Sequence, residues 1–311
     1  MLIASFGLLA GLILLYYGAE LLVEGSSKFA LSFGVRPLVV GMTIVALATS
    51  MPEFLVSLAA VIRQSSDLAA GNVIGSNIAN IGLILGAASL IAPMRVERST
   101  LMRELPIMLA LSLLTFFFAL DGELGRLDGF LLLLGLGMFL VYCYISSRRA
   151  VAAVNAPAEN AAAGKRLRYL TLVLLGIVGL GLGAELMVRS AIHIAHALGV
   201  SDLVIGITVV ALGTSLPELA ASMVSAWKGE GDLSVGNVIG SNIFNLAFVL
   251  ASCALVRPLK IEAGVVGYEL PLMLVFSLML WPLVYRRQRL GRTEGVILVA
   301  GYLVFVACYF Y

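Results

Sequence analysis

Long apolar stretches alternate with short polar connections along the whole chain. Ten of these stretches, each of roughly 18–25 residues, are long enough for a helix to cross the hydrocarbon core of a bilayer. We predict spans at 3–22, 37–62, 70–91, 103–120, 127–146, 169–189, 203–227, 234–256, 267–285 and 294–310. The pattern therefore predicts an all-α membrane protein with ten transmembrane helices.

One sequence pattern occurs twice in the chain. The stretch 41–80 recurs at 206–245 with a constant offset of 165 residues, so that Glu53 falls on Glu218 and Asn80 on Asn245. The only long polar connection lies between the two copies and lacks periodicity, which is typical of a flexible linker. We therefore predict a first five-helix repeat at 1–146, a linker at 147–168 and a second five-helix repeat at 169–311.

An odd number of helices in each repeat fixes their relative orientation. The second repeat must enter the membrane from the opposite side to the first, which makes an inverted-topology repeat, an architecture that many secondary transporters use. Fifteen of the 20 Lys and Arg residues fall in the linker and in the connections on its side of the membrane. Because positive residues accumulate on the cytoplasmic side, we expect a protein of the plasma (inner) membrane with a cytoplasmic linker and extracytoplasmic N- and C-termini.

Composition supports the membrane assignment and argues against several other classes. Hydrophobic residues make up 61% of the chain and charged residues 12%, against about 45–50% and 25% in soluble domains. No basic cluster with interleaved aromatic residues indicates nucleic-acid binding. The three cysteines show neither disulfide nor zinc spacing, and no hydrolase motif such as HExxH is present. We expect the lipid bilayer as partner, no enzyme activity and no cofactor; the sequence is compatible with a monomer.

Each copy of the repeated stretch places a carboxylate inside an apolar run. The motifs are ATSMPE, which ends at Glu53, and GTSLPE, which ends at Glu218. An ionisable group at membrane depth is costly and by default marks a functional site. Proline in a helix frees a carbonyl about four residues earlier. We expect such carbonyls near Ala46–Ala48 and Ala211–Gly213, where a bound cation would satisfy them.

Further oxygen-bearing side chains accompany both carboxylates. Carboxylate, carbonyl, hydroxyl and amide oxygens without a soft ligand suit hard cations such as Ca²⁺, Mg²⁺, Na⁺ or K⁺. In the two GNVIGSNI segments a spacing of four puts a Ser and an Asn on one helical face. The candidate side chains are Thr49, Ser50, Ser76 and Asn80 in the first copy and Thr214, Ser215, Ser241 and Asn245 in the second.

Two glutamates that arrive from opposite sides would give the site a formal charge of −2. One Ca²⁺ neutralises this charge, and so do two Na⁺ or two protons. Occupancy by one divalent ion or by several monovalent ions is then mutually exclusive, which is the physical requirement for antiport. Without a cation the two carboxylates would repel each other in a low dielectric, and this repulsion disfavours a crossing with an empty site.

These motifs resemble the α-repeats of the cation/Ca²⁺ exchanger superfamily, in particular its prokaryotic sodium/calcium exchanger group. The resemblance covers all ten predicted helices. It implies exchange of Ca²⁺ for Na⁺ by alternating access through one midplane site, built by helices two, three, seven and eight, while helices one and six slide across this core. The ligands that it implies are Glu53 and Glu218 at the centre, Thr49, Ser50, Ser76, Thr214, Ser215 and Ser241 with the Ala46 and Ala211 carbonyls along Na⁺ sites, and Asn80 and Asn245 beside them.

Two departures from related patterns rank the alternatives. Potassium-dependent exchangers resemble one another in carrying an acid at the place of Asn245, so the amide argues against K⁺ dependence. The cation/proton branch has an acid shortly after the Gly-Asn of its third helix, whereas Val73 follows Asn72 here, so H⁺/Ca²⁺ exchange ranks second. A cation channel, a different class, could also use paired carboxylates. The sequence leaves the coupling ion, the stoichiometry and the oligomeric state open.

Overall fold

The computed structural model describes residues 2–153, 163–198 and 211–310, and most of them are helical. The helices of the first half are α1 (Leu2–Ser32), α2 (Pro37–Val40), α3 (Ala46–Thr49), α4 (Met51–Ile62), α5 (Ser66–Ala79), α6 (Gly86–Ile91), α7 (Leu105–Phe118) and α8 (Arg126–Ala153). Those of the second half are α9 (Ala163–Ala197), α11 (Ala211–Thr214), α12 (Leu216–Trp227), α13 (Gly231–Phe244), α14 (Ala251–Val256), α15 (Leu270–Tyr285) and α16 (Arg292–Phe310). Wider π-helical turns join or precede several of them: η1 (Gly41–Val45), η2 (Asn80–Leu85), η3 (Thr100–Glu104), η6 (Asn245–Leu250) and η7 (Val265–Glu269).

The described helices are those of a membrane protein. Seven of them are long and apolar enough to cross a bilayer, and the bent pair Pro37–Thr49 and Met51–Ile62 makes up to eight. These coincide with eight of the ten predicted spans. Of the remaining two, 294–310 corresponds to α16, whereas the beginning of 203–227 lies outside the described residues. The all-helical membrane class is thus confirmed, and the number ten stays a prediction.

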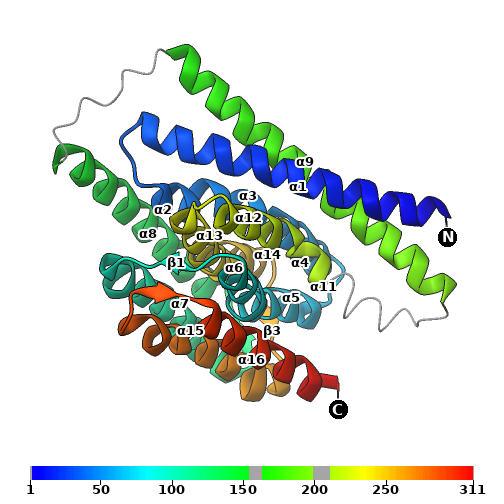
Figure 1. Ribbon diagram of the computed structural model, residues 1–311. Coiled ribbons are helices and arrows are strands. Elements are labelled where there is room, and N and C mark those ends of the chain that lie inside the picture. Colours follow the sequence, from blue (N-terminus) through cyan, green and yellow to red (C-terminus); the bar gives the residue numbers. More distant parts are fainter. Residues whose placement is uncertain (1, 154–162, 199–210, 311) are drawn as a thin grey trace.

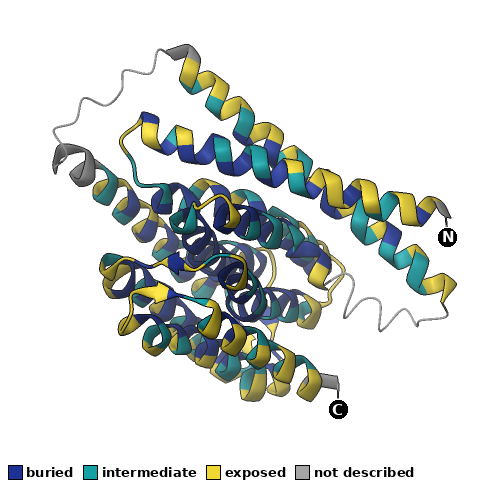
Figure 2. Cartoon of the chain, in the orientation of Figure 1, coloured by how far each residue is buried: buried dark blue, intermediate teal, exposed yellow. Residues whose placement is uncertain are grey.

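Apolar side chains cover the outside of the molecule, while the centre is formed by two spans. Ile3, Leu127 and Met138 are 89%, 69% and 63% exposed, and exposed positions line the outer helices in Figure 2. Lipid acyl chains would cover such a surface. In contrast, 72% of an 18-residue stretch of Ser66–Ile91 and 83% of one in Gly231–Val256 is buried inside the protein. These central spans contain the two GNVIGSNI segments.

Helices α1 and α9 form an antiparallel pair along one side of the molecule (Figure 1). A Cβ atom at Gly7 would lie 2.2 Å from Ser190 Oγ, and one at Gly25 would lie 2.8 Å from the Val173 nitrogen. Glycines therefore let the two helices approach closely along their length. The pair occupies equivalent places in the two sequence repeats, and its members run in opposite directions.

Two short antiparallel sheets tie the halves together. Strand β1 (Met94–Arg95) pairs with β4 (Arg289–Leu290), and β2 (Glu123–Leu124) pairs with β3 (Leu259–Lys260). By the offset of 165, β1 corresponds to β3, and β2 corresponds to β4 with a slip of one residue. Each half therefore gives one strand to each sheet, which is the arrangement that a pseudo-twofold axis between the halves produces.

Some helix ends differ from the prediction. Helix α1 continues to Ser32 rather than ending at 22. Helix α8 continues to Ala153 and α9 begins at Ala163, so both extend into the predicted linker 147–168, of which 154–162 lie outside the described residues. Hydropathy detects only the part of a helix that lies in hydrocarbon, because a helix can continue beyond the bilayer once water or headgroups solvate its side chains.

Candidate cation-binding site

The repeated motifs ATSMPE and GTSLPE each interrupt a membrane helix at a serine. Ser50 has φ −81° and ψ 2° between α3 and α4, and Ser215 has φ −90° and ψ 6° between α11 and α12. In the first copy the two parts are bent by 42°. Pro52 and Pro217 stand in the first turn after each break, where proline needs no intrahelical donor. The breaks place Glu53 and Glu218 at the beginnings of helices inside the protein.

The two carboxylates are buried and each is bound by the serine of the other half. Glu53 is 1% exposed and Glu218 is 0% exposed. Ser215 Oγ donates to Glu53 Oε1 over 3.0 Å, and Ser50 Oγ donates to Glu218 Oε1 over 3.3 Å. The carboxylates are also close enough to repel each other. The structure therefore brings the two predicted central residues into one site with crossed contacts.

Hydroxyl groups of the central spans complete this cluster. Ser215 Oγ lies 3.3 Å from Ser76 Oγ, and Thr49 Oγ1 lies 3.4 Å from Ser241 Oγ. Ser76 and Thr214 lie beside the Glu53 carboxylate, as Thr49 does beside that of Glu218. All the hydroxyls predicted from the sequence therefore lie around the two glutamates.

Several buried oxygens of the cluster have no hydrogen-bond donor among the residues that the structure describes. They are Glu53 Oε2, Glu218 Oε2, Asn80 Oδ1 and Asn245 Oδ1, and the Asn245 amide nitrogen is unpaired as well. Unsatisfied buried acceptors are costly, and a cation is the partner that carboxylate, amide and hydroxyl oxygens share. Within the described residues no three His, Cys, Asp or Glu side chains gather as a metal site. The donor set therefore fits a hard cation held by two carboxylates and neutral oxygens.

The two asparagines begin π-helical turns. Turn η2 starts at Asn80 and turn η6 starts at Asn245, and both residues are buried. A π-turn inserts one residue into the helical repeat and is frequent at functional sites. Asn80 donates to Asn242 Oδ1 over 3.0 Å, whereas Asn245 has no partner in the described part of the chain. The two asparagines therefore have the same backbone position at the start of a π-turn, but their side chains make different contacts.

The sequence reasoning did not single out Asn72 and Asn237. Asn72 Nδ2 donates to Ser57 Oγ over 3.0 Å, and Asn237 Nδ2 donates to Ser222 Oγ over 3.1 Å. Because Asn237 binds Ser222 through its amide nitrogen, its side-chain Oδ1 can accept a hydrogen bond from Thr49 over 3.2 Å. Both asparagines stand four residues before the predicted serines, on the same helical face, and this spacing was the available signal.

The structure shows the hydrogen-bond partners of one carbonyl in the predicted range Ala46–Ala48. The Ala46 carbonyl is not freed, because it accepts the Ser50 N–H over 3.0 Å, and Thr49 Oγ1 lies 3.4 Å from it. The carbonyl that Pro52 leaves without an N–H partner four residues earlier belongs to Ala48, which lies within the predicted range Ala46–Ala48. A cation at Ala46 would have to displace the weaker Thr49 contact. Ala211 begins α11, and its side chain lies outside the description.

The sodium/calcium exchanger protein family matches residues 3–145 and 168–311. This chain belongs to that family. The family is one of membrane transporters and not a class of enzymes. Its two matched segments coincide with the two predicted repeats and exclude most of the connection between them.

Relatives that match this chain over almost its whole length support its membership of the sodium/calcium exchanger family. Sodium/calcium exchanger MaX1 of Methanosarcina acetivorans is 35% identical over 342 residues, covering 98% of this chain and 97% of the relative. Inner membrane protein YrbG of Escherichia coli is 38% identical over 315 residues, covering 99% and 97%. The solved structure of the sodium-calcium exchanger NCX_Mj soaked with 10 mM Na⁺ and zero Ca²⁺ is 35% identical, covers 99% of both chains and superimposes with a TM-score of 0.87. The exchanger fold and a role in cation and calcium transport follow.

Proposed function

We propose that this exchanger is a secondary active antiporter of Ca²⁺ and Na⁺ that works by alternating access through one site between two inverted repeats. The observation that carries the proposal is the crossed pair Glu53 and Glu218. Each accepts a hydrogen bond from a serine of the opposite half, and the second oxygen of each has no partner in the described part of the chain. A single divalent ion neutralises two carboxylates, and two monovalent ions do the same. The names of the similar proteins favour Na⁺ as the coupling ion.

In this proposal both glutamates bind Ca²⁺ directly. Ca²⁺ accepts six to eight oxygen ligands at about 2.3–2.6 Å, so Asn80 and Asn245 are available to it as well. The site is built by the second, third, seventh and eighth predicted helices, which are α2–α4, α5–α6, α11–α12 and α13–α14. The neutral ligands assigned to Na⁺ are Thr49, Ser50, Ser76, Thr214, Ser215, Ser241 and the carbonyls of Ala46 and Ala211.

The proposal includes the topology. Five helices at 1–146 and five at 169–311 form the repeats, the 147–168 linker lies in the cytoplasm, and both termini lie outside the plasma membrane. The antiparallel α1 and α9 and the strands exchanged between halves support the inverted relation. Every ligand comes from one chain, so a monomer suffices.

The test is uptake of ⁴⁵Ca²⁺ into proteoliposomes loaded with Na⁺, K⁺ or a proton gradient. We expect uptake to require internal Na⁺, to saturate, and to be lost in Glu53→Gln and Glu218→Gln. Glu123→Gln, at an exposed strand residue, is the matched control and should transport normally. Uptake driven only by protons would assign H⁺/Ca²⁺ exchange, a strict need for K⁺ would assign a K⁺-dependent exchanger, and flux without any counter-ion would assign a channel.

A further inference from the structure

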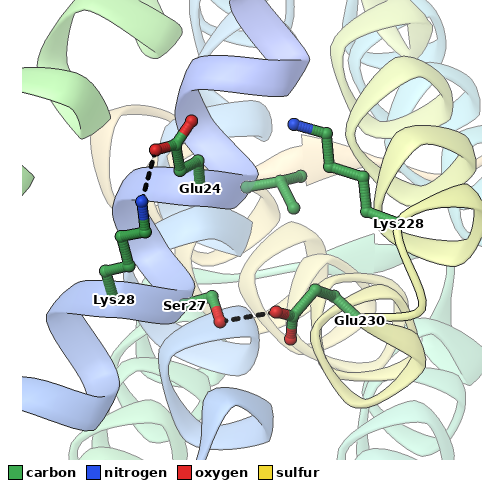
Figure 3. A pocket seen from close by; sticks show the side chains of 6 residues that line it. Glu24, Ser27, Lys28, Lys228 and Glu230 are labelled. Atoms are coloured by element: carbon green, nitrogen blue, oxygen red, sulfur yellow. Dashed lines mark hydrogen bonds and ion pairs between the residues drawn. The ribbon is translucent and has the colours of Figure 1, made fainter.

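Helix α1 makes charged and polar contacts with the end of α12 and the residues that follow it. Lys228 Nζ, at the end of α12, lies 2.7 Å from Glu20 Oε1 on α1, and the two side chains are only 29% and 31% exposed. Ser27 Oγ donates to Glu230 Oε1 over 2.8 Å. Figure 3 shows the Ser27–Glu230 bond and Lys228 around a pocket of about 270 Å³. We call Glu20 and Lys228 the α1–α12 pair.

The sequence repeats this pair at the offset of 165. Glu20 corresponds to Glu185 on α9, and Lys228 corresponds to Arg63 at the end of α4. The two helix ends have the same backbone: Lys228 has φ −77° and ψ 0°, Arg63 has φ −82° and ψ 6°. The residue after each is left-handed, with φ 80° at Gly229 and 67° at Gln64. Glu185 and Arg63, which we call the α9–α4 pair, therefore stand at places in the fold equivalent to those of Glu20 and Lys228.

The two equivalent pairs make different contacts. Glu185 forms an ion pair with Arg189 on its own helix, one turn away. Arg63 is exposed and forms no ion pair with any residue that the structure describes. The repeat therefore contains two equivalent pairs that could form this ion pair. In the structure only Glu20 and Lys228 form it.

Apolar packing shows the same difference. Tyr16 of α1 and Leu216 and Ala220 of α12 pack into one apolar cluster. Their equivalents, Gly181, Met51 and Leu55, instead line a pocket of about 180 Å³ between α9 and the broken helix.

This pocket reaches the cation-binding cluster. Thr49, Pro52 and Pro217 lie in its wall. The site is therefore covered on the α1–α12 side and approached by a hollow on the α9–α4 side.

We propose that the α1–α12 pair and the α9–α4 pair are alternatives, each formed in one access state of the exchanger. The inference rests on the proposed alternating-access function. Two halves of equivalent structure can exchange their contacts, and in inverted repeats this exchange opens the opposite side. An ion pair made in only one state shifts the equilibrium by its differential stability. Switching therefore breaks Glu20–Lys228 and forms Glu185–Arg63.

A second contact favours the state that the structure shows. The positions equivalent to Ser27 and Glu230 hold Ile192 and Ser65, which cannot form the same hydrogen bond. The α1–α12 side thus has one ion pair and one hydrogen bond, whereas the α9–α4 side can form the ion pair alone. The resting equilibrium should lie toward the state with the α1–α12 pair closed.

Reversible cross-linking tests the proposal. Cys308→Ala removes the exposed native thiol, and Cys143 and Cys253 are buried. In this background Glu20→Cys is combined with Lys228→Cys, and the pair is joined by a short, reducible bis-methanethiosulfonate. We expect ⁴⁵Ca²⁺ exchange to fall at least tenfold on cross-linking and to return on reduction. Glu24→Cys with Lys28→Cys, an ion pair within α1, is the control and should exchange normally when cross-linked.

The reciprocal relation is measured without transport. Glu185→Cys and Arg63→Cys are placed on the same background, and their cross-linking rate is compared with and without Glu20→Gln. Loss of the α1–α12 pair should raise that rate roughly two- to five-fold, the range of a partly exposed ion pair. No cross-link, an unchanged rate, or normal exchange in the cross-linked 20–228 variant would overturn the proposal. The cross-linking rate does not depend on ion flux. It therefore tests whether the two pairs alternate even in a protein that fails to exchange Ca²⁺ for Na⁺.

Discussion

The contacts of residues that are equivalent in the sequence repeat differ between the candidate cation-binding cluster and the helices α1 and α9. In the cluster, the two equivalent serines make equivalent contacts: Ser50 binds Glu218 as Ser215 binds Glu53. On α1 and α9, in contrast, Glu20 forms an ion pair with Lys228 of another helix, while its equivalent Glu185 pairs with Arg189 of its own helix. Under the proposed alternating access, we expect the serine–glutamate contacts to persist in both access states. The contacts that differ between the two states would then be those that α1 and α9 make with the core.

The largest effect tests the equivalence of the two carboxylates. Glu53→Gln and Glu218→Gln should each lower Ca²⁺ exchange about 100-fold or more, because each leaves one buried charge to face a divalent ion alone. Their losses should agree within about threefold, since each carboxylate accepts a hydrogen bond from the serine of the opposite half. ⁴⁵Ca²⁺ uptake into Na⁺-loaded proteoliposomes measures both. Loss in one variant with activity in the other would show that the cluster is functionally asymmetric despite its contacts.

The close contact of α1 and α9 gives the next prediction. A Cβ atom at Gly18 would lie 2.6 Å from the Leu180 nitrogen, so Gly18→Ala must separate the helices. We expect the free energy of unfolding to fall by about 1–3 kcal/mol and exchange to fall about tenfold if that free-energy cost falls on the rate-limiting state. Thermal unfolding in detergent and uptake measure the two effects.

Gly181→Ala is the matched control for this packing change. It lies on α9, where a Cβ atom would meet nothing within 4 Å. Its stability should equal that of the wild type or exceed it slightly, because Ala favours a helix over Gly. A comparable loss in both variants would mean that helix flexibility, and not close packing, accounts for the effect of Gly18→Ala.

Asn237 offers a smaller test of how rigid the cluster is. It accepts from Thr49 and donates to Ser222, so Asn237→Ala should misorient the Thr49 hydroxyl and raise the half-saturating Ca²⁺ concentration about tenfold. Ser222→Ala, which only loosens the amide, should shift it less in the same direction. Titration of ⁴⁵Ca²⁺ uptake separates half-saturation from maximal rate. A change in maximal rate alone would contradict this role of Asn237.

The smallest effect concerns the α1–α12 pair. Glu20→Gln should change the exchange rate roughly two- to five-fold, because a partly exposed ion pair contributes little. The charge swap Glu20→Lys with Lys228→Glu should recover most of the change. Glu24→Gln, which breaks only a pair within one helix, should change the rate less than about twofold. Equal effects of Glu20→Gln and Glu24→Gln would mean that surface charge alone matters.

Much of the site was predictable from the sequence because burial restricts which polar residues a membrane segment can contain. Glu53, Glu218 and the neighbouring hydroxyls stood out as repeated polar residues in apolar runs, and the structure brings them together. Asn72 and Asn237 were missed because their spacing of four from the predicted serines does not show which partner each side chain meets on another helix. The hydrogen bond from the Ser50 N–H to the Ala46 carbonyl was not predictable, because proline alone does not say whether a helix kinks or stops.

The sequence by itself determined the helical membrane class, the repeat and the chemistry of the site, because hydrophobic length and the cost of buried charge act locally along the chain. Only the tertiary structure decided which equivalent contacts are made. Glu20 and Glu185 stand in the same local sequence, yet one meets Lys228 and the other meets Arg189. Both choices satisfy the same local preferences and differ only in how distant helices are packed, so no pattern along the chain could distinguish them.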